Sequence, residues 1–255
     1  MATNYFVSAE TAARYARARP ELNSEFNPRL LEHTGNLGRA LDVGCGTGIS
    51  SRALTRVAGE VHGVDPSWVM LSEASPDANI FYCLGVGENL PYADRSFDLL
   101  GVGLALHWFD REAFLAEAAR VLRSTGWLFI ADTWFGGTMR GVPEFSDWMR
   151  ASYLQRYPDP PLNREPIANE GAAQFGFAIA DRCELEREVT MTCEGLATYL
   201  TTQSNVTAGL ERSGESLKGA TDWLVSELEH FFGSGGRTMP FGGSATLLRY
   251  SAAEP

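Results

Sequence analysis

Three glycines, Gly44, Gly46 and Gly48, alternate with other residues shortly after an acid, Asp42. Glycines in a turn remove the Cβ atoms that would keep a ligand away from the backbone. The dinucleotide-binding fingerprint is G-x-G-x-x-G, whereas the spacing here is G-x-G-x-G, with Ile49 where that fingerprint has its third glycine. A carboxylate at position 42 would repel a pyrophosphate but suits a ligand that carries an ammonium group. The pattern therefore favours close backbone contact with a ligand other than a dinucleotide.

A second acid, Asp65, lies 23 residues after Asp42 at the end of an expected strand. A carboxylate in that place can accept hydrogen bonds from both hydroxyl groups of a ribose. A further turn at 85–91 (GVGENLP) follows the next expected strand. The segments 96–100 (SFDLL) and 120–123 (RVLR) come after it and lead into two more strands.

In their order and spacing, these segments between residues 39 and 131 resemble the motifs of class I S-adenosylmethionine (SAM) dependent methyltransferases. The resemblance implies a doubly wound α/β fold with a mostly parallel seven-stranded sheet, SAM as the cofactor and methyl transfer as the reaction. Segments 15–20, 88–91 and 106–109 are similar to the small-molecule branch typified by ubiquinone/menaquinone-biosynthesis and trans-aconitate methyltransferases. One departure is Val86, which stands where many relatives have an acid for the adenine amino group.

The resemblance also implies where the cofactor binds. Asp42 is expected at the amino-acid end of SAM, Asp65 at the ribose and Glu88 beside the adenine. Gly103 and Leu104 are expected under the sulfonium, because ligands of open α/β sheets bind at the carboxyl ends of the strands. The full set of expected cofactor contacts is Tyr15, Arg19, Asp42, Gly44, Gly46, Gly48, Asp65, Pro66, Ser67, Met70, Gly87, Glu88, Gly103 and Leu104.

Tyr15 and Arg19 belong to this set because the N-terminal segment is expected to fold over the cofactor. Arginine is well built for bidentate recognition of a carboxylate, such as that of SAM. The alternative for this segment is a surface helix that ends at Pro20.

His107 follows the expected fourth strand, close to where the donor methyl should lie, and is the candidate general base. An imidazole with its ordinary pKa near 6.5 suits proton removal at neutral pH. A hydroxyl acceptor usually needs such a base, whereas a carboxylate, thiolate or amine does not. The alternative is that His107 and Trp108 pack against the cofactor or a lid without a chemical role.

The elements that must position these residues alternate along the chain. Apolar runs predict strands at 39–43, 60–64, 80–84, 97–102 and 127–131. Between them, helices are predicted at 49–57 and 67–74, with a further one that Asp110 caps and Gly126 ends. Such repeats predict a parallel sheet with helices on both faces.

After residue 134 the sequence becomes rich in proline, glycine and aromatic residues, which favours a lid over an apolar acceptor pocket. Strands are predicted at 184–192 and 245–250, and helices at 194–201 and 214–232. Three tryptophans, Trp108, Trp134 and Trp148, are expected to contact the acceptor; the alternative is that such aromatics form a hydrophobic core. The predicted division is an N-terminal helical segment (1–36), a SAM-binding core (37–134) and lid insertions with the final strands (135–255).

The overall composition narrows the class of ligand. The net charge is −11, and the arginines are scattered, which argues against nucleic acid or an anionic membrane as a partner. No apolar run is long enough to span a bilayer. Four widely separated cysteines and the absence of carboxylate or histidine pairs at ligand spacing predict no metal site and favour a reducing cytoplasm. The oligomeric state has no signal in the sequence.

The leading interpretation is therefore a methyltransferase that acts on a small, partly apolar molecule, at oxygen first and at carbon or nitrogen as alternatives. A nicotinamide-dependent oxidoreductase is disfavoured by Ile49 and Asp42. A protein that binds SAM without transferring its methyl group, as a sensor or an activating subunit, would carry the same cofactor motifs.

Overall fold

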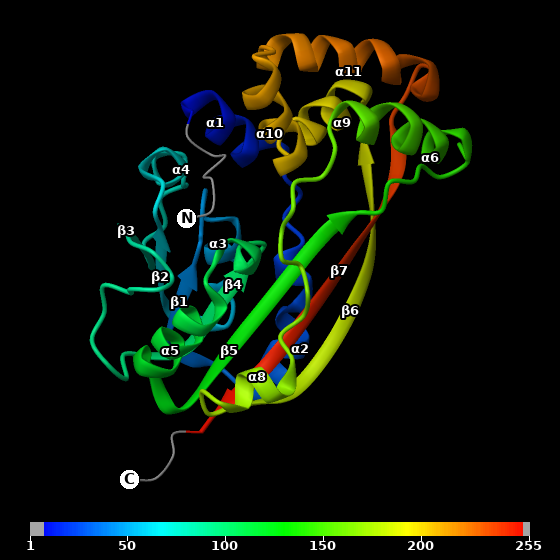
Figure 1. Cartoon of the computed structure of the whole chain (residues 1–255). Coiled ribbons are helices and arrows are strands. Elements are labelled where there is room, and N and C mark those ends of the chain that lie inside the picture. Colours follow the sequence, from blue (N-terminus) through cyan, green and yellow to red (C-terminus); the bar gives the residue numbers. More distant parts are fainter. Residues whose placement is uncertain (1–7, 252–255) are drawn as a thin grey trace.

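The computed structural model describes residues 8–251, so residues 1–7 and 252–255 of the predicted terminal segments lie outside the described range. Its strands are β1 (Leu37–Val43), β2 (Ala58–Asp65), β3 (Ile80–Leu84), β4 (Phe97–Gly103), β5 (Leu122–Phe135), β6 (Phe177–Met191) and β7 (Arg237–Tyr250). They form one sheet in the order β3-β2-β1-β4-β5-β7-β6. The first five strands are parallel, and β7 runs antiparallel between β5 and β6 (Figure 1). The predicted mostly parallel, seven-stranded α/β sheet is confirmed.

Helices cover both faces of this sheet. They are α1 (Ala9–Ala18), α2 (Asn27–Thr34), α3 (Ile49–Leu54), α4 (Trp68–Ser72), α5 (Arg111–Val121), α6 (Glu144–Trp148), α7 (Leu154–Arg156), α8 (Asn169–Ala173), α9 (Cys193–Leu200), α10 (Ser204–Ser213) and α11 (Leu217–Phe232). The described residues also form two short 3-10 helices, η1 (Asn23–Phe26) and η2 (Leu106–Trp108), and one π-helix, η3 (Met149–Tyr153). One core layer packs α5 and α8 against the sheet, and a second packs α2 and α3 on the other face.

Local sequence signals explain several of these boundaries. Asp110 caps α5 by accepting a hydrogen bond from the backbone of Ala113, as predicted. The predicted end of that helix at Gly126 is wrong, because β5 begins at Leu122 immediately after α5 and runs through Gly126. Leu122 is fully buried and pairs with Phe97 of β4, so burial and strand pairing decide the boundary.

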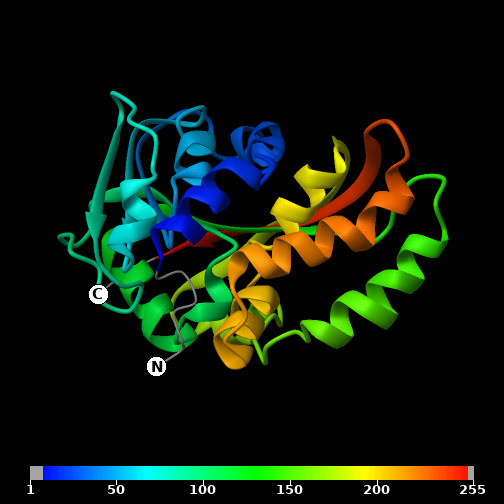
Figure 2. The same cartoon turned by 90° about the horizontal axis from the view of Figure 1, so that it is seen from above.

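The lid is larger than the sequence predicted. Its helix α10 falls in a stretch predicted as a connection, and Gly214, where the next predicted helix begins, instead ends α10 with φ of +70°. Figure 1 shows α9, α10 and α11 above the sheet, and Figure 2 shows α6 and α11 gathered on the side away from α4. Aromatic residues of α6, η3, α9 and α11 form a hydrophobic cluster with Met239 and Phe241 of β7, which we call the lid cluster.

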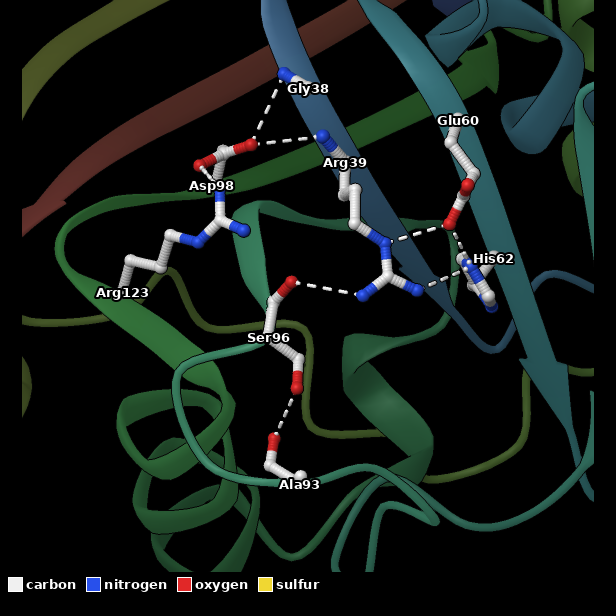
Figure 3. Close-up of polar contacts among 8 residues, drawn as sticks. All are labelled: Gly38, Arg39, Glu60, His62, Ala93, Ser96, Asp98 and Arg123. Atoms are coloured by element: carbon white, nitrogen blue, oxygen red, sulfur yellow. Dashed lines mark hydrogen bonds and ion pairs between the residues drawn. The ribbon is translucent and has the colours of Figure 1, made fainter.

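A polar network ties together the amino ends of the strands, opposite the carboxyl ends that are expected to bind the ligand (Figure 3). Arg39 contacts Glu60 (Nε to Oε1, 2.7 Å) and His62 (Nη2 to Nε2, 2.9 Å). Asp98 accepts hydrogen bonds from the backbone of Gly38 and Arg39 and pairs with Arg123. These contacts join β1, β2, β4 and β5, so His62 belongs to a structural network.

Within residues 8–251, no helix combines the length and the apolar character that crossing a membrane requires.

Candidate cofactor and acceptor site

A cavity of about 1210 Å³ lies at the carboxyl ends of the parallel strands, beneath α1 and the lid. It is larger than the roughly 300–1,000 Å³ of a usual small-molecule site. The predicted site residues in its wall are Tyr15, Arg19, Gly44, Gly46, Asp65, Pro66, Ser67, Met70, Gly87, Glu88, Gly103, Leu104, His107, Trp108 and Trp134. Asp42, Gly48 and Trp148 are not part of the wall.

The glycine turn runs directly from β1 into α3. Gly44 has φ of +72°, and a Cβ built on it would lie 2.5 Å from the Cβ of Ala105. At Gly48, φ is +75°, and a Cβ would lie 2.1 Å from the hydroxyl of Tyr82. Both positions therefore require glycine, but for different reasons: Gly44 lines the cavity, whereas Gly48 packs against β3 behind it. The expected contact of Gly48 with the cofactor stays a prediction, although Gly48 lies outside the cavity wall.

Asp65 meets the glycine turn because β1 and β2 are parallel neighbours in register, with Val43 opposite Val64. Its Oδ2 accepts a hydrogen bond from the backbone N–H of Gly46 (2.9 Å), and its Oδ1 accepts one from Ser67 (2.8 Å). The side chain is 8% exposed, and burial raises the pKa of its carboxyl. A carboxylate offers about four acceptor positions, so two remain for a ligand with neighbouring hydroxyls.

Asp42 is fully buried behind the cavity wall. Its Oδ2 accepts hydrogen bonds from the hydroxyls of Ser50 (2.7 Å) and Ser51 (2.6 Å). Burial raises the pKa of Asp42 to about 6, although these two hydrogen bonds oppose the rise. Asp42 therefore lies outside the cavity wall and accepts a hydrogen bond from Ser50, which lines the cavity; its expected direct contact with the amino-acid end of SAM stays a prediction.

The turn after β3 forms the next part of the wall. The side chain of Glu88 accepts a hydrogen bond from the backbone of Asp110 (Oε1 to N, 2.9 Å), which joins this turn to the start of α5. A Cβ on Gly87 would lie 3.4 Å from the ring of Phe109, so the ring packs directly under the turn. Val86 is more than one third exposed and lines the cavity.

Leu104 adopts a left-handed backbone conformation with φ of +57°, which is rare for a residue with a branched side chain. Its N–H donates to the carbonyl of Ala131 (3.0 Å), which fixes the turn after β4 against β5. Strained residues of this kind cluster at ligand sites, where the surrounding structure holds them. Gly103 and Leu104 both line the cavity, where the sequence placed the sulfonium.

His107 lies in η2 and lines the cavity, as expected for a residue after β4. Burial and the nearby positive charges of Arg164, Arg111 and Arg19 lower its pKa to about 4. At neutral pH the imidazole is therefore neutral, but it is a weaker base than an ordinary histidine. This pKa argues against strong general-base catalysis in the cavity as it stands.

Tyr15 and Arg19 of the N-terminal segment line the cavity and contact the lid. Arg19 donates from Nε to the hydroxyl of Thr202 (2.9 Å) and from Nη2 to its carbonyl (3.0 Å). Its guanidinium also lies over the rings of Tyr15 (4.7 Å) and Tyr199 (5.2 Å). The N-terminal segment therefore packs between the cavity and the lid rather than forming an isolated surface helix.

The three tryptophans expected at the acceptor separate into two groups. Trp108 and Trp134 line the cavity, and the Trp134 side chain is 47% exposed. Trp148 instead lies in the lid cluster, where its Nε1 donates to Glu227 of α11 (3.0 Å). The apolar side of α6 packs against α11, so Trp148 lies outside the cavity wall, and its expected contact with the acceptor stays a prediction.

Sequence reasoning missed several residues of the wall. Asp132 at the carboxyl end of β5 follows the same strand-end rule that identified Leu104, so its position was predictable in principle. Arg164 lies in the irregular segment between α7 and α8, and Ser244 and Thr246 come from β7, which reaches the cavity through the sheet topology. No local sequence pattern identifies Arg164, Ser244 or Thr246 as residues of the cavity wall.

The comparisons with known proteins agree with this geometry. The family model described as "Methyltransferase domain" matches residues 41–130. Malonyl-[acyl-carrier protein] O-methyltransferase from Erwinia pyrifoliae is 31% identical over 66% of this chain and 64% of its own length. The chain spans between 47% and 66% of the length of the first curated relatives that it matches.

Solved structures show the same fold. A "putative type II methyltransferase" from Anaeromyxobacter dehalogenans superposes with a TM-score of 0.67 at 24% identity, over 92% of this chain and 97% of the other. The [4+2]-cyclase SpnF superposes with a TM-score of 0.51 at 17% identity, over 97% of each chain. These likenesses establish the fold alone, because one fold can carry different reactions. The match of residues 41–130 to a methyltransferase domain and the named methyltransferases among the curated relatives thus support a class I SAM-dependent methyltransferase, with SAM as the cofactor.

Proposed function

We propose that this protein transfers the methyl group of SAM to an oxygen atom of a small molecule. The observation that carries this proposal is the continuity of the cavity, which joins the glycine turn and Asp65 to the lid wall in one space of about 1210 Å³. That volume accommodates a cofactor and an acceptor together, since a single drug-sized ligand occupies less. The named O-methylation activity of the relative from Erwinia pyrifoliae supports oxygen as the acceptor atom.

The wall residues fit SAM. The approach of Gly44 and Gly46 leaves backbone next to the cavity, with Ser50 beside them for the amino-acid end. Asp65 keeps free acceptor positions for the ribose, and the turn at Gly87 suits the flat adenine. SAM supplies an electrophilic methyl group, which a nucleophile attacks in line as the thioether leaves.

The protein would align the methyl donor with the acceptor and keep water away from both. Holding donor and acceptor in line can contribute about 7–11 kcal/mol to lowering the barrier. Tyr199 of α9 and Phe241 of β7 line the cavity, and such aromatic rings would limit the water around a bound acceptor. His107 faces the same space, and we propose that its neutral imidazole contacts the acceptor by hydrogen bonding.

The four cysteines are free thiols, which supports a cytoplasmic location.

The test begins with equilibrium binding of SAM, of its product S-adenosylhomocysteine (SAH) and of NAD to the purified protein. We expect SAM and SAH to bind and NAD to bind at least tenfold more weakly. Asp65→Ala should weaken SAM binding by tenfold or more, because hydrogen bonds to a charged group contribute about 1.5–3 kcal/mol each. Asp147→Ala, an exposed acid paired with Arg150, is the control that should leave binding unchanged.

Release of SAH is then measured with a panel of hydroxyl, carboxylate, amine and thiol metabolites. Methylation of a hydroxyl or carboxylate supports the proposal, and methylation at nitrogen or carbon corrects the acceptor atom. Tight SAM binding without SAH release from any acceptor would instead establish a SAM-binding protein without transferase activity. Preference for NAD would overturn the cofactor assignment.

A further inference from the structure

Three arginines line the cavity, and none of them has a carboxylate within ion-pair distance among residues 8–251. The donors of Arg19 are used by Thr202. Arg111, the first residue of α5, donates from Nη2 to the carbonyl of Asn163 (2.9 Å), while its Nε is buried with no acceptor in the described chain. Arg164 makes no hydrogen bond or ion pair with the described residues. A buried donor without an acceptor is costly, and such groups are rare unless a ligand or water completes them.

The charges of these arginines converge on the space around His107. Every charged group that shifts the pKa of His107 is an arginine: Arg164, then Arg111, then Arg19. Burial raises the pKa of Asp132, and the positive charges of Arg164 and Arg111 partly oppose this rise. The cavity wall also contains Asp65, Glu88, Asp110 and Glu165, but among residues 8–251 no carboxylate lies within ion-pair distance of Arg111 or Arg164. Two guanidinium groups without a paired carboxylate attract an anion locally.

The location of Arg111 and Arg164 separates them from the cofactor groups. Apart from Gly103 and Leu104 at the end of β4, the residues that fit SAM follow β1, β2 and β3. His107 comes after Leu104, and Asp132 lies near the carboxyl end of β5. Arg164 belongs to the irregular segment between α7 and α8, which Figure 1 shows passing beside β5 below the lid. We therefore assign the pair to the acceptor side of the cavity.

We propose that the acceptor is an anion, a small organic carboxylate or phosphate, and that Arg111 and Arg164 hold its anionic group. The proposal rests on the proposed function, since it assigns the substrate class of the same cavity. Guanidinium groups bind carboxylates and phosphates through paired N–H donors, and the unpartnered Nε of Arg111 supplies one such donor. The bound anion would also accept a hydrogen bond from the buried Nε–H of Arg111.

The test uses the whole protein loaded with SAH, so that the cofactor part of the cavity is filled. Calorimetry measures the binding of succinate, inorganic phosphate and the neutral analogue succinamide. We expect succinate or phosphate to bind and succinamide not to bind; which of the two anions binds more tightly separates a carboxylate from a phosphate acceptor. Arg111→Gln and Arg164→Gln should each weaken anion binding by about tenfold, because hydrogen bonds to charged groups are at stake.

Arg150→Gln is the matched control, since Arg150 is an exposed arginine paired with Asp147 on the lid surface. It should leave anion binding unchanged, and Arg164→Lys should retain more of it than Arg164→Gln because it keeps the charge. The nuclear magnetic resonance titration of His107 is a second readout: its pKa should rise on anion binding and in both glutamine variants, since each removes positive charge from its surroundings.

Equal binding of succinate, phosphate and succinamide would overturn the proposal, and so would anion binding that neither glutamine variant weakens. SAH binding is measured first for every variant. If wild-type protein fails to bind SAH, the proposed function itself fails, whereas normal SAH binding with no anion preference refutes this substrate class alone.

Discussion

Asp42 and Asp65 are both buried carboxylates at the carboxyl edge of the sheet, but their partners differ. Asp65 receives two backbone N–H groups and faces the cavity, whereas Asp42 receives two serine hydroxyls behind it. Oδ1 of Asp42 has no partner among the described residues. Asp42 therefore remains a desolvated charge at neutral pH, and the glycine turn is built on a group that opposes folding there.

We expect the free energy of unfolding to depend on the ionisation of Asp42. The folded pKa of Asp42, about 6, lies above its value of 3.8 in an unfolded chain. Its contribution to the free energy of unfolding is therefore present below about pH 4 and is lost as pH rises through 6, by up to about 3 kcal/mol. Urea unfolding at pH 4.5 and 7.5 should show Asp42→Asn gaining stability relative to wild type at the higher pH.

The control for this comparison is Asp147→Asn, an exposed carboxyl on α6. It should differ from wild type by the same small amount at both pH values. A difference between wild type and Asp42→Asn that does not change with pH would show that Asp42 titrates normally in the folded protein.

At the scale of elements, the turn between β1 and α3 is fixed by what packs behind it. Ala105, from the turn after β4, occupies the space next to Gly44, and Tyr82 of β3 occupies the space next to Gly48. The turn is therefore braced by both neighbouring parts of the sheet edge. Its geometry depends on these contacts as much as on the freedom of glycine itself.

Gly44→Ala should destabilise the protein more than Gly214→Ala. Both glycines have similar φ angles, +72° and +70°, so each alanine carries the same backbone strain of about 1–2 kcal/mol. A Cβ on Gly214 meets open space, whereas one on Gly44 collides with Ala105, which adds about 1–3 kcal/mol. Denaturant unfolding measures the difference, and calorimetry should show weaker SAH binding for Gly44→Ala alone. Equal losses in the two variants would mean that packing against Ala105 does not constrain the turn.

Elements with strong local signals were predictable from the sequence. The strand at 80–84 was predicted with the boundaries of β3, and Asp110 was identified as the cap of α5. Boundaries failed where tertiary contacts decide, as at Leu122, whose burial begins β5 before Gly126. The strand-end rule pointed to Gly103 and Leu104, and both line the cavity. The position of Arg164 in the cavity wall could not be predicted, because its segment reaches the cavity through the packing of the lid.

At the scale of the whole molecule, the lid and the sheet share their longest strands. Phe241 of β7 belongs to the lid cluster, while Leu247 and Leu248 of the same strand pack under α2 and α5. Arg14 of α1 adds hydrogen bonds to Thr201 (3.0 Å) and Thr221 (2.8 Å), which join α1 to the lid. The predicted lid insertion is therefore part of one cooperative structure.

We expect sheet and lid to unfold together. Phe145→Ala in the lid cluster and Phe114→Ala beneath the sheet should each lower stability by about 3–5 kcal/mol within a single transition. Circular dichroism follows the whole chain, and tryptophan fluorescence includes the contributions of Trp148 and Trp223, which pack in the lid cluster. The two curves should coincide for wild type and both variants. A fluorescence transition that precedes the loss of secondary structure in Phe145→Ala would identify the lid as a separate folding unit.

The position of β7 has a consequence for how the protein is made. Although β7 is the last strand in the chain, it lies inside the sheet between β5 and β6. During synthesis, β5 and β6 leave the ribosome before the strand that joins them, so both expose unpaired backbone until the C-terminal segment arrives. Because β7 also carries Ser244 and Thr246 into the cavity wall, a nascent chain can form the glycine turn but not the complete site. The acceptor side of the cavity therefore forms only after β7 has been synthesised.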